Sequence, residues 1–243
     1  VLSELIGCGL VPVTVLDTVF RQQNTSRIAL NAHAMKNGET KLLYGDDFQF
    51  IDVSDVAEAV QSIQEIYQKA VKTYGLEQVQ VLSPFRLKSD AGVKNLNQML
   101  RELANPLLNK TMELSYGNTS FRFGDKVMQT KNTDVASNGD IGFIAKVDKN
   151  NDDVLTVKFS DHRCKTYTID ELNQLELAYA TTIHKSQGSE YPAVVIPLLS
   201  GPSMLMNRNL LYTAVTRARK CVTLVGNDAT FNQMIQNTSQ QKR

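Results

Sequence analysis

The sequence predicts an α/β fold, in which a parallel sheet is flanked by helices and interrupted by a small all-β insert. In the first half, apolar runs of strand length alternate with stretches of helical spacing, which favours a parallel sheet with crossover helices. After about residue 115 the helical spacing disappears, and short strands follow one another between turn sequences. From Leu175 the alternation resumes. We therefore expect an α/β domain over 1–115 and 175–243, with the insert at 116–174.

The first part of the α/β domain contains a β-type run, Val11–Leu16, followed by a helix. The helix is predicted to begin at a cap among residues 24–26 and to end at Asn37-Gly38. Two strands, Phe48–Val53 and Val79–Ser83, are each followed by a helix. Ser54 and Asp55 open the first of these helices, which ends at Gly75. The second is predicted from Asp90 to Asn105, because a proline follows.

The insert and the last part of the chain differ in their periodicity. The strands expected in the insert are Phe121–Thr130, Gly142–Val147, Val154–Phe159 and Lys165–Ile169. The segment that follows them is predicted to contain a buried strand, a helix, a strand and a final helix. Their expected positions are Ala193–Leu198, Asn207–Arg219, Cys221–Val225 and from Asp228 onward.

Composition excludes several classes of function. The chain has 243 residues with a formal net charge of +1, so any nucleic-acid site must be local rather than a global basic field. Cys8, Cys164 and Cys221 lie far apart without zinc-ligand spacing, so we expect no metal site and a reducing, cytoplasmic setting. No apolar run reaches about 18 residues, so no membrane span is expected. Because the first residue is Val1, we expect the start to be a cut inside a longer protein.

Residues 182–190, TIHKSQGSE, form a polar loop between two predicted core strands. A loop rich in hydroxyl, imidazole, ammonium and amide groups is how α/β proteins display phosphate-binding groups. This loop, together with LLYTAVTRA at 210–218 and VFRQ at 19–22, resembles the second motor domain of superfamily 1 helicases. Within that superfamily it is similar to the RecD-like group, which includes the α chain of exodeoxyribonuclease V.

The resemblance implies a RecA-like sheet with an SH3-like barrel as the insert. It also implies an ATP-dependent helicase that moves 5′→3′ on single-stranded DNA in recombination or repair. ATP with Mg²⁺ would be held mainly by an upstream motor domain of the same protein, and no cofactor is expected on these 243 residues alone. Single-stranded DNA, that upstream domain and other exodeoxyribonuclease V subunits are the expected partners.

Two arginines are the catalytic candidates that the resemblance supplies. Arg21 and Arg217 would contact the phosphates of ATP, because the fixed fork of a guanidinium matches two phosphate oxygens. Arg217 would act as an arginine finger. The ordinary alternative is a favourable charge at a strand or helix end, which we assign to Arg219 and Lys220. The candidates for nucleotide contacts are Gln22, Gln187, Gly188 and Glu190.

The DNA candidates gather in the polar loop and at the end of one strand. Hydroxyls, ring N–H groups and backbone amides commonly contact DNA phosphates. The residues are Ser83, Arg86, Thr181, Thr182, His184, Lys185 and Ser186.

The chain contains no GxxxxGK[ST] sequence, so we expect it to be inert as an ATPase by itself. The alternative function is a non-catalytic nucleic-acid-binding module that keeps the fold without the motor. A nuclease ranks low, because no cluster of Asp, Glu and Lys occurs at metal-site spacing.

Overall fold

The structure is a computed structural model of the chain. It describes residues 2–14, 26–86, 92–108, 112–148, 153–159, 161–202 and 204–238. Two predicted site residues, Arg21 and Gln22, lie outside the described residues. Asp90, the predicted helix start, also lies outside them.

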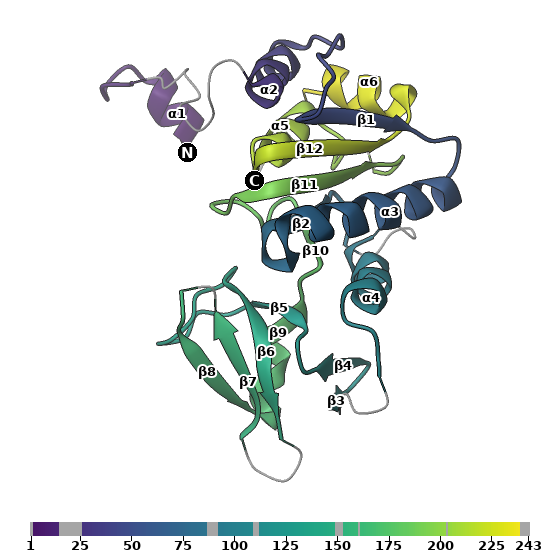
Figure 1. Cartoon of the computed structure of the whole chain (residues 1–243). Coiled ribbons are helices and arrows are strands. Elements are labelled where there is room, and N and C mark those ends of the chain that lie inside the picture. Colours follow the sequence, from purple (N-terminus) through teal and green to yellow (C-terminus); the bar gives the residue numbers. More distant parts are fainter. Residues whose placement is uncertain are drawn as a thin grey trace.

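A five-stranded parallel sheet forms the centre of the α/β domain, as the sequence predicts (Figure 1). Hydrophobic residues alternate along its strands, so that Val194 and Ile196 face one core and Ala193 and Val195 face the other. The strand order is β1 (Phe48–Asp52), β12 (Ala218–Gly226), β11 (Tyr191–Leu198), β2 (Val79–Ser83) and β10 (Ala180–Thr182).

Helices cover both faces of this sheet, and each face has its own hydrophobic core (Figure 1). One face carries α2 (Arg27–Asn37), α5 (Arg208–Val215) and α6 (Asp228–Gln236). The other carries α3 (Val56–Tyr74) and α4 (Val93–Ala104). The first helix, α1 (Leu2–Gly7), belongs to neither core.

The helix ends follow the predicted capping residues. The Ser26 hydroxyl accepts from the Ala29 N–H, and Gly38 ends α2 with a φ of 86° that a residue with a Cβ rarely adopts. The Asp55 carboxylate caps α3 in the same way, and Gly75 ends that helix. These predicted boundaries of α2 and α3 are confirmed.

Three predicted elements differ from the structure. Residues 11–14 of the expected strand Val11–Leu16 lie in no strand, and their apolar side chains are exposed. The expected helix to Arg219 ends at Val215, because the carbonyl of Arg217 accepts from the Tyr191 N–H and draws the chain into β12. Arg219 and Lys220 therefore lie on a strand, and their assignment to a helix end was wrong.

The third difference is in the insert, where the run predicted as one strand from Phe121 to Thr130 is two. β4 (Thr119–Arg122) and β5 (Lys126–Gln129) are separated by a turn in which Gly124 has a φ of 84°. β4 pairs with β3 (Glu113–Tyr116) as a hairpin that the sequence pattern did not reveal. A strand period continues through this turn, so periodicity alone does not show the break.

The rest of the insert is a five-stranded antiparallel sheet with a core of its own (Figure 1). Phe121, Ile144, Val157 and Tyr167 lie in that core. A short 3-10 helix, η2 (Ile169–Gln174), precedes its last strand; another, η1 (Leu76–Gln78), precedes β2 in the α/β domain. The strand order is β8 (Cys164–Thr168), β7 (Asp153–Phe159), β6 (Ile141–Val147), β5 and β9 (Leu175–Leu177).

Buried polar groups join the insert to the α/β domain. The Asp125 carboxylate accepts from Arg101 Nε at 2.9 Å and from the Tyr179 hydroxyl at 2.9 Å. Lys126 Nζ donates to the Val79 carbonyl at 2.9 Å and to Gln80 Oε1 at 3.1 Å. Burial lowers the pKa of Lys126 to about 7. Because these bonds cross between the two parts, the insert is fixed directly to β2, α4 and the segment before β10.

Among the described residues, no helix is both long enough and apolar enough to cross a membrane. The same residues contain no cluster of His, Cys, Asp and Glu side chains with the arrangement of a metal site.

Candidate functional site

The polar loop predicted from the sequence runs from the carboxyl edge of the parallel sheet, where the strands end, to the amino edge, where they begin. β10 ends beside β2, where Thr182 pairs with Ser83, whereas β11 begins beside β12, where Tyr191 pairs with Ala218. Because all these strands run in the same direction, residues 183–190 must return from the carboxyl ends of the strands to their amino ends. Ile183 is buried in the core beneath α5, which places this crossover loop on that face of the sheet.

Local hydrogen bonds fold the crossover loop into successive turns. The Ser186 hydroxyl donates to the Ile183 carbonyl at 2.7 Å and is fully buried. The Lys185 N–H donates to Thr182 Oγ1 at 3.3 Å, and Gly188 has a φ of 90°, which favours glycine. His184 is exposed, and so are Gln187 and Gly188. The loop backbone is thus held from within while its imidazole and amide face water.

At the carboxyl edge of the sheet, two basic side chains share one carboxylate. Arg86 Nη2 and Lys185 Nζ each lie 2.7 Å from an oxygen of Glu176. Glu176 belongs to β9, which pairs with β5 in the sheet of the insert although it lies beyond the predicted end of the insert at residue 174. The buried Thr181 hydroxyl has no hydrogen-bond partner among the described residues. The buried Ser83 hydroxyl accepts from the Phe85 N–H and shapes the turn that leads to Arg86.

Asn97 of α4 closes the open side of β10. Its amide nitrogen donates to the Ala180 carbonyl at 2.9 Å, and its amide oxygen accepts from the Ala180 N–H at 2.9 Å. These two bonds replace the strand neighbour that β10 lacks on that side. The strand that carries Thr181 and Thr182 is therefore fixed on both sides.

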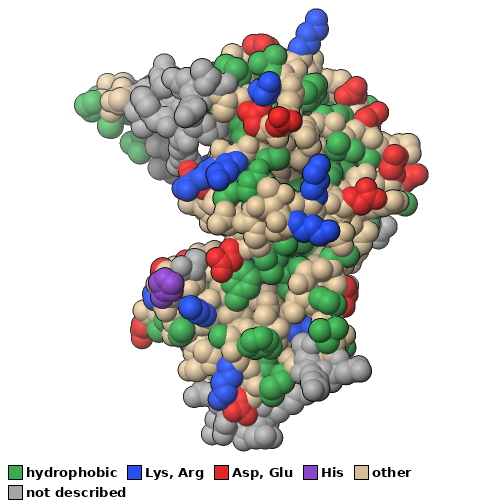
Figure 2. Space-filling view, in the orientation of Figure 1, with side chains coloured by type: hydrophobic (Ala, Val, Ile, Leu, Met, Phe, Trp, Pro, Cys, Tyr) green, Lys and Arg blue, Asp and Glu red, His purple; other side chains and the backbone are tan. Residues whose placement is uncertain are grey.

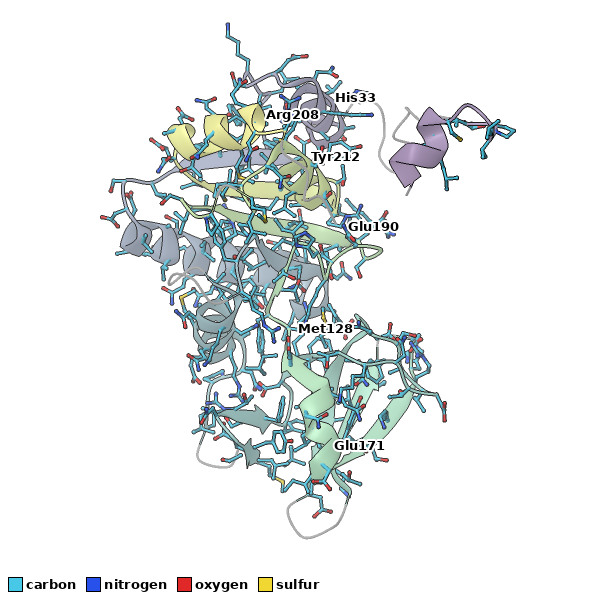
Figure 3. All side chains as sticks on the ribbon, turned by 180° about the vertical axis from the view of Figure 1, so that it is seen from behind. His33, Met128, Glu171, Glu190, Arg208 and Tyr212 are labelled. Carbon is cyan, nitrogen blue, oxygen red and sulfur yellow. The ribbon has the colours of Figure 1, made fainter. Side chains whose placement is uncertain are left out.

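At the amino edge, Arg217 ties the end of the crossover loop to α5. Its Nη1 donates to the Ser189 carbonyl at 3.1 Å and its Nε donates to the Thr213 carbonyl at 3.2 Å. The residue is 8% exposed. Next to it, Glu190 pairs with Arg219 at 2.6 Å, and Figure 3 shows Glu190 at this end of the sheet.

The described candidates thus form two groups, one at each edge, joined by the crossover loop. Sequence reasoning missed Glu176. Alternation along a strand indicates which face of the sheet a side chain is on, but not which basic side chains it contacts. Sequence reasoning also missed the contact of Arg219 with Glu190, which depends on the pairing of β11 with β12. On the face shown in Figure 2, basic side chains lie among acidic ones, which agrees with a local site rather than a basic field.

Two family models match parts of the chain. The UvrD-like helicase C-terminal domain matches residues 177–225, and the ATP-dependent RecD-like DNA helicase SH3 domain matches residues 96–159. An ATP-dependent RecD2 DNA helicase of Deinococcus radiodurans is 34% identical over 210 residues, which is 86% of this chain. The chain carries two domains of a RecD-like helicase. The RecD-like resemblance inferred from three motifs is thereby confirmed.

A second relative of this RecD-like chain is a RecBCD enzyme subunit RecD of Haemophilus influenzae, 30% identical over 84% of the chain. The chain spans 28% of the length of the Deinococcus protein and 30% of the Haemophilus subunit. It thus corresponds to less than a third of either relative.

Solved structures agree on the fold. A Pif1 helicase from Bacteroides in complex with ADP-AlF3 and ssDNA has a TM-score of 0.53 at 19% identity, over 90% of this RecD-like chain and 52% of that one. A Pif1 helicase from Candida albicans has a TM-score of 0.51 at 17% identity, over 88% of this chain and 56% of that one. The RecA-like α/β fold with an SH3 insert is therefore established.

Proposed function

We propose that the complete protein is an ATP-dependent DNA helicase that acts in recombination or repair and moves 5′→3′ on single-stranded DNA. This chain supplies part of the DNA track and two arginines of an ATP site shared with a second motor domain. The observation that carries the proposal is the crossover loop. It joins the side chains proposed to bind phosphate at one edge of the sheet to Arg217 at the other. A change at one site could reach the other through eight residues.

The DNA contacts belong to the carboxyl edge and the exposed part of the loop. His184 offers a ring N–H to solvent, and Thr182 and Lys185 lie within three residues of it. Ser186 acts through its backbone, because its hydroxyl is committed to the Ile183 carbonyl. Ser83 shapes the turn before Arg86 in the same indirect way. Single-stranded DNA is the partner, in keeping with the DNA-bound complex named for the Bacteroides protein.

Among the described residues, the proposed ATP contacts centre on the amino edge, where Arg217 lies. Arg217 and Arg21 would stabilise charge on the transferring phosphoryl group, while Mg²⁺ and the phosphate loop lie on the second motor domain. Gln22, Gln187, Gly188 and Glu190 would contact the nucleotide. In the structure the Arg217 guanidinium donates to the Thr213 and Ser189 carbonyls. By analogy with the Haemophilus relative, other exodeoxyribonuclease V subunits are further partners.

The DNA part of the proposal is tested with Thr182→Ala and His184→Ala in this chain. Each should weaken binding of a fluorescein-labelled oligothymidylate through the loss of a hydrogen bond to a phosphate. The slope of log K against log salt should stay nearly unchanged, because neither substitution removes a Lys or Arg charge that neutralises a phosphate. Fluorescence anisotropy over a salt series measures both quantities. His33→Ala is the control, because His33 lies on α2, outside the site. Unchanged affinity in both loop variants would refute the DNA assignment.

A further inference from the structure

Glu176 brings an acidic group of the insert between two cations of the α/β domain. Its Oε1 contacts Arg86 and its Oε2 contacts Lys185, both at 2.7 Å. The two cations come from separate segments, since Arg86 follows β2 and Lys185 belongs to the crossover loop. Two basic side chains that converge on a pair of anionic oxygens also suit a phosphate group. In the structure, the carboxylate of Glu176 therefore occupies a place that fits a phosphate.

A narrow pocket adjoins this cluster. Thr181, Thr182 and Met128 line it together with the three charged residues, and Figure 3 shows Met128 where the insert meets the α/β domain. Its volume is about 20 Å³, enough for about one water molecule and too small for a phosphate group. With Glu176 in place, the pocket has no room for a phosphate.

The orphan hydroxyl of Thr181 gives independent support. Buried hydroxyls are nearly always hydrogen-bonded, because leaving one unpaired is costly. Thr181 is 3% exposed and its hydroxyl has no partner within the described part of the chain. It lines the same pocket as Arg86 and Lys185, so an incoming phosphate oxygen would supply the missing acceptor.

We propose that Arg86, Lys185 and Thr181 form a subsite for one phosphate of single-stranded DNA, and that Glu176 is its internal competitor. This inference rests on the proposed function, since it concerns the same loop and partner. In the free chain the carboxylate neutralises both cations, and DNA displaces it. Glu176 can leave the two cations because its side chain is 37% exposed and can rotate into the solvent. The insert thereby lowers the affinity of the α/β domain for DNA.

Glu176→Gln tests the competitor directly. The variant keeps the shape of the side chain and removes its charge, so it should bind the labelled oligothymidylate about three- to tenfold more tightly, the scale of two partly exposed ion pairs. Its log K against log salt should steepen by up to about 0.7, because no freed carboxylate takes up a cation. Glu171→Gln is the matched control. Glu171 also lies on the insert, is paired with Lys165 and is 35% exposed, but in Figure 3 it lies far from Met128.

A double-mutant cycle separates competition from a general charge effect. In the background Arg86→Ala/Lys185→Ala, Glu176→Gln should give no gain in affinity, because the groups it masks are absent. A gain that persists in that background, or one that Glu171→Gln reproduces, overturns the proposal.

The cycle also separates this inference from the proposed function. If Thr182→Ala and His184→Ala weaken binding while Glu176→Gln leaves it unchanged, the competitor is refuted and the DNA site stands. If none of these variants alters binding, the DNA site itself is refuted, and the competitor with it.

Discussion

At the residue scale, the charged groups of the candidate site lie toward two opposite edges of the parallel sheet. Arg217 touches the end of the crossover loop through the Ser189 carbonyl, whereas Lys185 reaches Glu176 near its start. These two contacts lie toward opposite ends of the crossover loop. Their functions should therefore be separable by substitution.

Arg217→Ala in the complete protein should lower kcat for ATP by about 10³-fold or more, the scale of losing an arginine finger. Binding of single-stranded DNA should remain near that of the unsubstituted protein. Arg217→Lys should rescue little, because a lysine lacks the planar fork of donors. Steady-state ATPase measured beside DNA affinity tests this. Parallel loss of both activities would contradict the separation of the two edges.

At the element scale, the site depends on the joint between the insert and the sheet. Asp125 lies at the start of β5, fully buried, and accepts from Arg101 of α4 and from Tyr179 just before β10. The strand that leads into the crossover loop is thus held by a carboxylate of the insert. A buried charge pair of this kind is costly to break, because the remaining partner stays buried without its counter-charge.

Asp125→Ala should lower the free energy of unfolding by about 3–5 kcal/mol, since it leaves the Arg101 guanidinium without its principal partner. Urea unfolding followed by circular dichroism measures the loss. Glu102→Ala is the matched control: Glu102 pairs with Arg122 but is 55% exposed, so its removal should cost less than about 1 kcal/mol. Equal losses in the two variants would mean that Asp125 is not part of a buried joint.

At the scale of the whole molecule, the stability of the two-part fold should depend on pH through Lys126. Burial lowers its pKa in the folded chain to about 7, from 10.5 in an exposed lysine. The unfolded chain therefore binds this proton more tightly between those two values. The free energy of unfolding should therefore increase between pH 7 and pH 10.5, by up to about 1.4 kcal/mol per pH unit, and this contribution is lost as the pH falls through 7.

Lys126→Met should abolish this contribution. The variant leaves the Val79 carbonyl and Gln80 without their donor, so it should be less stable throughout, and the gap to the natural chain should widen as the pH rises. Urea midpoints measured at several values from about pH 7 to pH 9.5 test the slope. A gap that is constant with pH would show that Lys126 keeps an ordinary pKa in the folded chain.

The sequence by itself determined the class of fold, the caps of α2 and α3, and the family. Strand and helix periods differ in spacing, a cap needs only a side chain within three residues of the helix, and a motif loop is contiguous, so these features are local. Only the tertiary structure decided which edge of the sheet each group occupies, because strand order brings Ser83 beside Thr182 and Arg217 beside Ser189 across long stretches of chain. It also decided that Glu176 meets Arg86 and Lys185, since that meeting depends on how the insert docks on the sheet.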